Sequence, residues 1–592
     1  MNKFFKAVSV LWKTSKIFFI LTFILSIFSA VPGVLNLLIW KKIIDMISLY
    51  LVNNQISWVG VIGCLFIHYL LKMLADVLDR LNSYIKIIFS RKVEKYVTNE
   101  TIDAIGMMNL KDIEDSEMHN MIQKATEESC SKMMSLLTNL IDVINNATTF
   151  IGMSGIIISF NFKIYLIIFA SILPMAIYNK KYFNKLYDVY NSRVEKIRFS
   201  KELKSMASRS DVFKEIKVFN SLNYIKLKIN EIIDDITEQD KRTQKELSVK
   251  EIVSRTIEIF FMYLLKGSII VYGIASKNSI GTINMNMDSV TQLQNATANI
   301  VFVFISMHED LLYLSSFTEL SEYKQKKEAE NKKQESLLIR DFIIETIELV
   351  GVWFKYTDDG RYIIKNLNFK FEVGKTYAIV GYNGGGKSTL IKILMGLYVP
   401  QKGSILINGI DISQYNVNEY REKLIVVFQD FVKYPFTVKE NIAIGNINEL
   451  DDAQRIQNAA ESACATSFIN DLPNKYDEKL VRGWENSTDL SIGQWQRIAI
   501  ARSNMREGQL VIFDEPSAAL DARTENKILS EVMGSRVDRI GIVITHRFLN
   551  IKKADAILVI KDGVIVNCGK HTELMQKSEV YKELYEAQKE MI

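Results

Sequence analysis

The sequence predicts a chain of two parts, an α-helical membrane-spanning region followed by an α/β domain. Long apolar runs lie before about residue 316, whereas short strand-like runs alternating with helical stretches lie after it. The composition is 48% hydrophobic yet 24% charged, an average that fits neither a soluble enzyme nor a pure membrane bundle. We therefore expect a transmembrane domain at 1–320, a charged linker at 321–345 and an α/β domain at 346–592.

Six apolar segments in the first part are candidate membrane spans, since a helix needs about 20 apolar residues to cross the hydrocarbon core. They lie at 17–40, 58–71, 136–160, 164–177, 257–275 and 290–314. Short loops alternate with two long polar segments of helical pattern, at 72–135 and 178–256. Lysines before the first span place the N-terminus in the cytoplasm. The spans are thus predicted to continue as long helices into the cytoplasm and to return there.

Two of the spans carry polar side chains along one helix face. These residues are Asp142, Asn145, Asn146 and Thr149 in the third span, and Gln292, Asn295, Asn299 and Ser306 in the sixth. Polar residues inside a membrane either hydrogen-bond to another helix or face an aqueous cavity. The sequence leaves both interpretations open.

Charge and cysteine content exclude several classes of function. The net charge is only +5, and the lysines and arginines mostly flank apolar segments instead of forming an aromatic-rich basic patch, so no nucleic-acid partner is expected. The cysteines, Cys64, Cys130, Cys464 and Cys568, are far apart and form no CxxC pair. We therefore expect reduced thiols and neither a disulfide framework nor a zinc site.

The strongest motif of the α/β part is GYNGGGKST, which begins at Gly381 after the strand-like TYAIV and opens a helical stretch. This is the phosphate-loop pattern in its strand–loop–helix context. Backbone N–H groups surround the phosphates of a nucleotide, Lys387 reaches the β- and γ-phosphates, and Ser388 holds Mg²⁺. The motif predicts binding of ATP and Mg²⁺ by Gly381, Asn383, Gly384, Gly385, Gly386, Lys387, Ser388 and Thr389.

A second motif, LVIFDE at 510–515, is an apolar strand that ends in two carboxylates. Asp514 is placed to reach Mg²⁺, directly or through water, as in phosphate-loop ATPases. Glu515 is the natural general base to polarise the attacking water. The two motifs together predict an ATPase.

Between these motifs, LSIGQWQR at 490–497 resembles the signature loop of the ATP-binding-cassette family. The resemblance implies that Ser491, Gly493 and Gln494 complete the ATP site of an opposite subunit, so that two cassettes face head to tail. Ser491, the Gly493 N–H and the following helix N-terminus would receive the γ-phosphate. Ile492 stands where the family usually has glycine, a change that we expect to be tolerated.

Further residues match elements of this family in the same order along the chain. Tyr356 matches the aromatic that stacks on adenine, Gln429 the lid glutamine that touches Mg²⁺ and water, and His546 the switch histidine that contacts the γ-phosphate. Asp521 matches the aspartate at the dimer seam, and Glu485 an acidic position that faces the coupling segments. The resemblance thus implies Glu515, His546 and Gln429 as catalytic residues and Ser388, Gln429 and Asp514 as Mg²⁺ ligands.

The resemblance extends over the whole chain to the six-span exporters of the family. It implies a half-transporter in the cell membrane, with the N-terminus and the ATPase domain in the cytoplasm and with coupling helices near 114–118 and 219–224. Because neither the catalytic carboxylate nor the switch histidine is degenerate, a homodimer is favoured over an asymmetric heterodimer.

A narrower resemblance concerns the cargo. FQDFVKY at 428–434, DEPSAALD at 514–521 and KEIK at 214–217 are similar to exporters of lantibiotic-type peptides. No Cys/His peptidase constellation precedes the first span, so another protein would cut a leader peptide. Two alternatives remain open: a multidrug or lipid exporter of the same architecture, and a membrane-bound ATPase that regulates without transporting.

Overall fold

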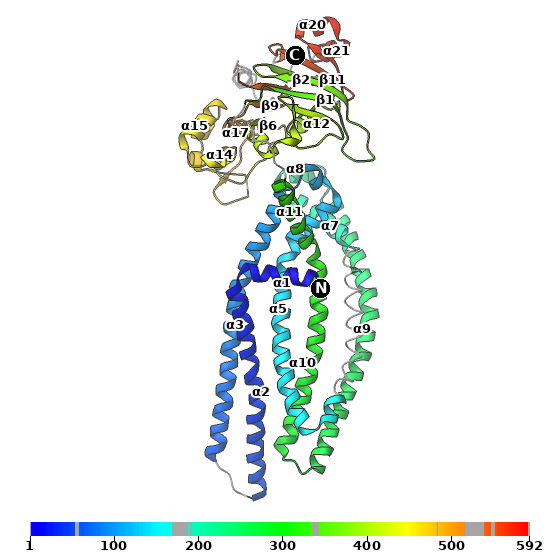
Figure 1. Cartoon of the computed structure of the whole chain (residues 1–592), viewed down its shortest axis with the longest axis vertical. Helices are drawn as coiled ribbons and strands as arrows, with labels where there is room; N and C mark the ends of the chain where they lie inside the picture. The colour runs from blue at the N-terminus through cyan, green and yellow to red at the C-terminus, as the bar shows by residue number, and fades with distance from the viewer. Residues whose placement is uncertain are drawn as a thin grey trace. The chain divides into compact units, whose positions relative to one another are not determined.

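The computed structural model describes residues 2–53, 58–167, 188–189, 192–333, 343–481, 483–515, 538–545 and 551–589. The chain divides into two compact units (Figure 1). The helical unit comprises Met1–Met108 and Ser116–Lys327. The α/β unit comprises Asn109–Asp115 and Glu328–Ile592, so that a short segment between two helices of the first unit belongs to the second.

The helical unit is built from long helices. They are α1 (Asn2–Thr14), α2 (Lys16–Asn53), α3 (Trp58–Gly106), α5 (Ser116–Phe160), α7 (Val194–Ser208), α8 (Ser210–Val218), α9 (Leu222–Ala275), α10 (Ile280–Tyr313) and α11 (Ser315–Lys333). At 1.5 Å per residue, the 54 residues of α9 extend over about 80 Å, far more than the hydrocarbon core of a bilayer. The prediction that spans continue as long helices beyond the membrane is confirmed.

Within the described ranges, α2, α3, α5 and α9 are each long and apolar enough to cross a membrane. The pair α10 and α11, bent by 45°, qualifies as one further span. The remaining span expected, at 164–177, lies largely outside the described residues. The helical unit is therefore that of a multi-pass membrane protein.

The polar residues of the third and sixth spans meet where α5 packs along α10 (Figure 1). The amide of Asn139 on α5 donates to Asp310 Oδ2 (2.8 Å) and to Ser306 Oγ (3.1 Å) on α10. At a second position on the same helix pair, Asn299 Nδ2 donates to Asn146 Oδ1 at 3.3 Å. Of the residues in the two predicted polar stripes, Asn146, Asn299 and Ser306 thus form interhelical hydrogen bonds.

The α/β unit contains two main sheets. The strands are β1 (Thr346–Phe354), β2 (Ile364–Glu372), β3 (Thr376–Gly381), β4 (Lys402–Ile407), β5 (Ile410–Asp411), β6 (Leu424–Val427), β7 (Lys479–Leu480), β8 (Ser487–Thr488), β9 (Leu510–Asp514), β10 (Ile540–Ile544), β11 (Ala556–Lys561) and β12 (Val564–Gly569). One sheet is antiparallel, in the order β2-β1-β4-β5, and the other has the order β12-β11-β3-β10-β9-β6. In the second sheet, β11, β3, β10, β9 and β6 run parallel and β12 is antiparallel to β11.

The helices of this unit are shorter. They are α4 (Leu110–Glu114), α12 (Lys387–Leu394), α13 (Val417–Glu422), α14 (Val438–Ala443), α15 (Ala453–Ser462), α16 (Thr466–Asn470), α17 (Ile492–Asn504), α20 (His571–Lys577) and α21 (Glu579–Lys589). One core cluster packs the two sheets around α12, and a second packs α14 to α17 against β6 and β9 around the fully buried Trp495. The fold is thus an α/β domain following a helical bundle, as the sequence predicts.

The sequence-predicted strands β3, β6, β9 and β10 are apolar throughout and buried on both faces, as strands of a parallel sheet are. Because these four strands run parallel, their carboxyl ends lie at one edge of the sheet. In such sheets ligands bind in the crevice outside those ends. In the sequence, the phosphate loop, Gln429 and His546 follow these strands, and Asp514 is the last residue of β9.

The two segments expected to be coupling helices, 114–118 and 219–224, each cross a boundary between two elements. In the first, Glu114 ends the short helix α4 (Leu110–Glu114), while 116–118 already belongs to α5. Asp112 accepts from the backbone N–H of Asn109 and so holds the first turn, and the extended backbone of Asp115 (ψ 132°) ends the helix. The second, at 219–224, is a turn after α8 that contains Asn220 at φ 52°, and α9 begins at Leu222.

Candidate active site

The phosphate loop connects β3 to α12 and depends on glycine where the backbone passes close to its neighbours. A Cβ on Gly381 would lie 2.1 Å from the carbonyl oxygen of Ile560 on β11. Gly386 precedes α12 at φ 101°, a left-handed conformation that favours glycine. The backbone path of this loop therefore explains why glycine stands at these two positions of the motif.

Lys387 lies at the centre of the loop and is almost completely buried. Its Nζ donates to the carbonyl oxygens of Gly381 (2.9 Å) and Tyr382 (3.1 Å). Burial lowers the pKa of Lys387, and the nearby carboxylates of Glu515 and Asp514 act in the opposite direction. The ammonium group is thus held under the loop, at the position from which it reaches phosphates.

The other loop residues differ in exposure. Asn383, Gly384 and Ser388 are exposed, whereas Gly385 is buried. Its carbonyl accepts from the N–H of Gly563 (3.2 Å), and an added Cβ would lie 3.0 Å from the carbonyl oxygen of Tyr382. A larger residue at Gly385 therefore requires the loop to shift by a few tenths of an ångström.

Two side chains predicted from separate motifs meet at the edge of the sheet. Glu515 follows β9 with φ 48°, and its N–H donates to the carbonyl of Ile544 at the end of β10 (2.9 Å). Gln429, two residues after β6, donates through Nε2 to Glu515 Oε2 at 2.9 Å. The parallel sheet therefore brings the expected general base and the expected lid glutamine into direct contact.

Asp514, the other carboxylate at this edge, has a strongly shifted pKa. Burial, followed by repulsion from Glu515 and Asp430, raises its pKa to about 6. Its Oδ1 atom is buried and has no hydrogen-bond partner. A buried carboxylate oxygen without a donor, beside other carboxylates, fits a cation better than a structural role.

The residues present fit Mg²⁺ bound together with nucleotide phosphates. Among the described residues no three His, Cys, Asp or Glu side chains form a metal cluster. A site with Asp514 as the acidic ligand and the exposed hydroxyl of Ser388, the residue after Lys387, as a second ligand would leave the other positions to phosphate oxygens and water, which is how Mg²⁺ is usually bound.

Tyr356 lies beside the phosphate-loop helix. Its hydroxyl forms a 2.9 Å hydrogen bond with Thr389 Oγ1 on α12, and its ring is partly exposed. The structure thus brings Tyr356 together with the phosphate loop, as expected. Thr389 itself is buried and is engaged by this contact.

The signature residues form the start of α17. The Ser491 hydroxyl accepts from the N–H of Gln494 (3.3 Å), and the Gln494 side chain accepts from the N–H of Ser491 (2.9 Å). This capping box begins the 13-residue helix α17, whose N-terminal dipole favours an anion. Ile492, which replaces the usual glycine, is 64% exposed, so its side chain fits without displacing the core.

Two expected site residues cannot be placed. Asp521 and His546 lie outside the described residues. By chain position, His546 follows β10 by two residues, at the same edge as Glu515.

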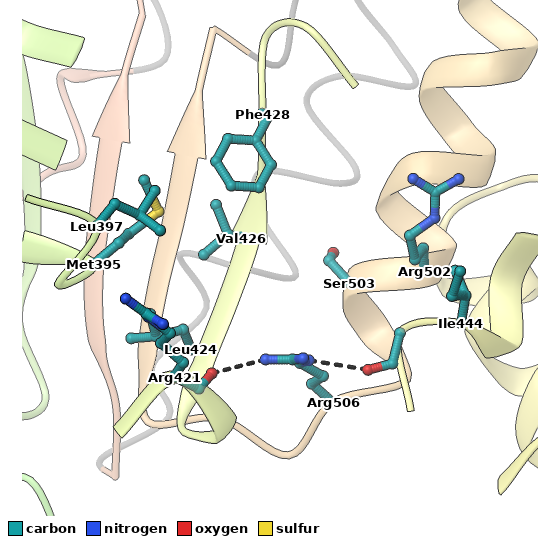
Figure 2. Close-up of a pocket in the computed structure, with 11 residues that line it drawn as sticks. Met395, Leu397, Arg421, Leu424, Val426, Phe428, Ile444, Arg502, Ser503 and Arg506 are labelled. Carbon is teal, nitrogen blue, oxygen red and sulfur yellow. Dashed lines mark hydrogen bonds between the residues drawn. The ribbon is translucent and has the colours of Figure 1, made fainter. Parts of the chain in front are cut away.

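A groove of about 300 Å³ lies next to this site, at the seam between the two core clusters (Figure 2). Apolar side chains of Met395, Leu424, Val426 and Phe428 line one side. Arg506 joins the two sides, because its guanidinium donates to the carbonyls of Arg421 (2.7 Å) and Gly445 (2.9 Å). Phe428 directly precedes Gln429, the residue that contacts Glu515.

Comparison with known proteins identifies this arrangement. Residues 364–518 match the protein family described as ABC transporter, and the match contains the phosphate loop, the signature residues and both carboxylates. Residues 364–518 thus form an ABC transporter domain. The α/β unit of the chain is an ATP-hydrolysing nucleotide-binding domain of the ABC transporter type, and the helices of the other unit are long and apolar enough to span a membrane.

Two curated relatives align over nearly the whole chain. The subtilin transport ATP-binding protein SpaT of Bacillus subtilis is 29% identical over 576 residues, 95% of this chain and 91% of that protein. The nisin transport ATP-binding protein NisT of Lactococcus lactis subsp. lactis is 26% identical over 92% of this chain and 91% of that protein. The ATP-dependent lipid A-core flippase of Escherichia coli (strain K12) is 34% identical, but over only 51% of this chain and 52% of the flippase.

A solved structure has the same fold. The structure of a bacterial Atm1-family ABC exporter with ATP bound superposes with a TM-score of 0.79, covering 95% of this chain and 97% of that chain at 21% sequence identity. The chain therefore shares the fold of that exporter over nearly its whole length, with a helical part followed by an α/β part, as the sequence predicts.

Sequence reasoning missed one contact of the site. Tyr398, 4% exposed, lies against the ring of Tyr356 and also donates a hydrogen bond to Glu114 of α4. An isolated tyrosine after a helix has no sequence signal that distinguishes it from an ordinary core residue.

Proposed function

We propose that this ABC transporter exports a ribosomally made, lantibiotic-like peptide from the cytoplasm through the cell membrane. Its N-terminus and nucleotide-binding domain would lie in the cytoplasm. The contact of Gln429 with Glu515, beside the orphaned oxygen of Asp514 and the buried Lys387, carries the ATP-hydrolysis part of this proposal.

Each residue of the edge has a distinct task in the proposed reaction. Glu515 accepts the proton of the attacking water, while Gln429 holds the carboxylate and the water in place. Lys387 and the N–H groups of the phosphate loop stabilise the charge that develops on the transferred phosphoryl group. Mg²⁺, held by Asp514, Ser388 and Gln429, supplies positive charge to the phosphate oxygens when bound. Tyr356 holds the adenine, and His546 contacts the γ-phosphate.

The site is completed by a second copy of the chain. In each copy the capping box fixes the start of α17, so that Ser491, the Gly493 N–H and Gln494 present a preorganised anion receptor. We propose that these groups receive the γ-phosphate bound by the partner copy and that Asp521 lies at the seam. One transmembrane part and one nucleotide-binding domain per chain support a homodimer with two such sites.

Two observations support a peptide cargo. The relatives that align over nine-tenths of the chain are named for transport of subtilin and nisin. In the bundle, Asn145 Oδ1 is buried without a hydrogen-bond partner, so an acceptor remains unused on the polar face of α5. A peptide carries many backbone donors, each costing several kcal/mol if it enters hydrocarbon unsatisfied, and amide groups in the bundle lower that cost.

Export of a lipid is the second candidate, because the lipid A-core flippase relatives share the nucleotide-binding half at 34% identity. That match covers about half of this chain. It therefore supports the ATPase more strongly than the cargo.

Transport into inside-out vesicles tests the proposal. Vesicles containing the protein receive MgATP and a fluorescent precursor peptide from the same genome, a labelled lipid or a hydrophobic dye. We expect the peptide alone to enter and to stimulate ATP hydrolysis, and vesicles with Glu515→Gln to show neither effect. If lipid or dye stimulates hydrolysis and the peptide neither stimulates nor enters, the cargo assignment is wrong.

A further inference from the structure

The short helix α4 is attached to the nucleotide-binding unit by three contacts. Leu110 packs against the core cluster of the two sheets, and Lys111 Nζ lies 3.4 Å from Asp358 Oδ1. The third contact is the hydrogen bond from the Tyr398 hydroxyl to Glu114 Oε2. In the sequence α4 lies between α3 and α5, both long enough to span a membrane.

The contacts of α4 differ in how far water screens them. Lys111 and Asp358 are both more than half exposed, and such surface pairs contribute little. Tyr398 is 4% exposed, and its hydroxyl would lack a partner if Glu114 moved away. A hydrogen bond to a carboxylate is about twice as strong as one between neutral groups. The Tyr398–Glu114 bond is therefore the stronger polar attachment of the helix.

Burial, followed by the hydrogen bond with Glu114, raises the pKa of the Tyr398 phenol well above its usual range. The phenol therefore stays protonated at any physiological pH and remains the donor of this bond.

The ring of Tyr398 continues the contact toward the nucleotide site. It meets the ring of Tyr356 edge-to-face, with centroids 5.4 Å apart and planes at 87°. Phe354, 5.1 Å from both tyrosine rings, packs against the pair. Tyr356 in turn is bonded to Thr389 on the helix that follows the phosphate loop.

A continuous series of contacts thus runs from α12 through Thr389, Tyr356 and Tyr398 to Glu114 on α4. Edge-to-face pairs of this kind contribute about 0.5–1.5 kcal/mol beyond burial and depend on ring orientation. A rotation of the Tyr356 ring consequently changes the contact that orients Tyr398, and Tyr398 has only Glu114 as its hydroxyl partner among the hydrogen bonds found for it.

We propose that Tyr398 is a positioning residue that links the orientation of the Tyr356 ring to the placement of α4 through Glu114. This inference rests on the proposed role of Tyr356 in holding adenine. ATP that stacks on Tyr356 selects one orientation of the ring and so favours one placement of α4. Since such coupling is reciprocal, loss of the Glu114 contact weakens ATP binding, although Glu114 does not touch the nucleotide.

The test measures ATP affinity of the full-length protein in lipid nanodiscs, by titration with a fluorescent ATP analogue without Mg²⁺ so that no turnover occurs. We expect Glu114→Ala and Tyr398→Phe each to raise the dissociation constant about fivefold, the lower end of typical allosteric couplings. The double variant is expected to show the same change of about fivefold, because both substitutions break one contact. Glu114→Gln, which keeps an acceptor oxygen, is expected to restore affinity.

Two variants serve as matched controls. Asp358→Ala removes the exposed charged contact of α4, and Tyr415→Phe removes another buried phenolic hydrogen bond, to the carbonyl of Ile407. Both are expected to bind ATP like the unchanged protein. Melting temperatures of all variants, measured in parallel, separate loss of folding from loss of coupling.

Three results would overturn the inference: unchanged affinity in Glu114→Ala and Tyr398→Phe, additive effects in the double variant, or equal weakening in Tyr415→Phe. Tyr356→Ala distinguishes this failure from failure of the proposed nucleotide site. If Tyr356→Ala weakens binding and the other two do not, only the link to α4 is wrong. If Tyr356→Ala also binds normally, the adenine assignment itself is wrong.

Discussion

The two units of the molecule each contain a polar cluster, and the clusters differ in how their atoms are satisfied. In the bundle, Asn139 donates to Asp310 and Ser306, and Lys132 Nζ lies 3.7 Å from Asp310 Oδ1, so both carboxylate oxygens of Asp310 have a partner within the protein. At the sheet edge, Asp514 Oδ1 is buried without a donor, beside Glu515. A satisfied cluster stabilises a fold, whereas an unsatisfied one requires a ligand.

The largest effect of a substitution is expected on the rate of ATP hydrolysis at the edge of the parallel sheet. Glu515→Gln removes the proposed general base and should lower the rate of ATP hydrolysis by about 10²–10⁴-fold, the usual contribution of such a group. ATP binding should be retained, since the phosphate loop is unchanged. Steady-state hydrolysis and nucleotide titration on the same preparation measure both effects. A variant that hydrolyses ATP at the original rate would show that another group accepts the proton.

In the bundle, substitution of Asn139 should lower the stability of the protein and not the rate of ATP hydrolysis. Asn139→Ala leaves Asp310, which is 2% exposed, without its amide donor, and an unsatisfied buried group costs about 1–3 kcal/mol. We expect a lower melting temperature in detergent and an unchanged dissociation constant for ATP. Asn139→Leu combined with Asp310→Leu should recover stability, because both polar partners are then replaced. Reduced ATP binding without loss of stability would contradict the assignment of a structural cluster.

Contacts between residues close together in the sequence could be predicted from it, whereas contacts between distant residues could not. The phosphate loop and the pair Asp514–Glu515 were predictable, since a strand–loop–helix or a strand end encodes its geometry in a few consecutive residues. Tyr398 and Glu114 are 284 residues apart and belong to no motif, so only the fold brings them together. The bounds of α4 were missed for a similar reason, since an extended Asp115, and not a proline or glycine, ends the helix.

The smallest effect is expected on thermal stability, in a comparison of two adjacent residues on the polar face of α5. Asn146 accepts from Asn299 of α10, and Asn146→Ala should cost about 0.6 kcal/mol, the average for a hydrogen bond between membrane helices. Asn145 Oδ1 has no partner, so Asn145→Ala should leave the melting temperature unchanged or raise it. Thermal unfolding of both variants in the same detergent makes the comparison. Equal destabilisation by the two substitutions would show that Asn145 is also a packing contact.

ATP hydrolysis is proposed to occur at composite sites, with Lys387 of one copy and Ser491 of the other. The most direct test of this arrangement is a mixed dimer of one Lys387→Ala chain and one Ser491→Arg chain, isolated through two different affinity tags. Each homodimer loses both sites and should be inactive, whereas the mixed dimer keeps one site with both residues intact. We predict that the mixed dimer recovers ATP hydrolysis that neither homodimer shows. A mixed dimer as inactive as the two homodimers would contradict composite sites and indicate that each chain hydrolyses ATP with its own Lys387 and Ser491.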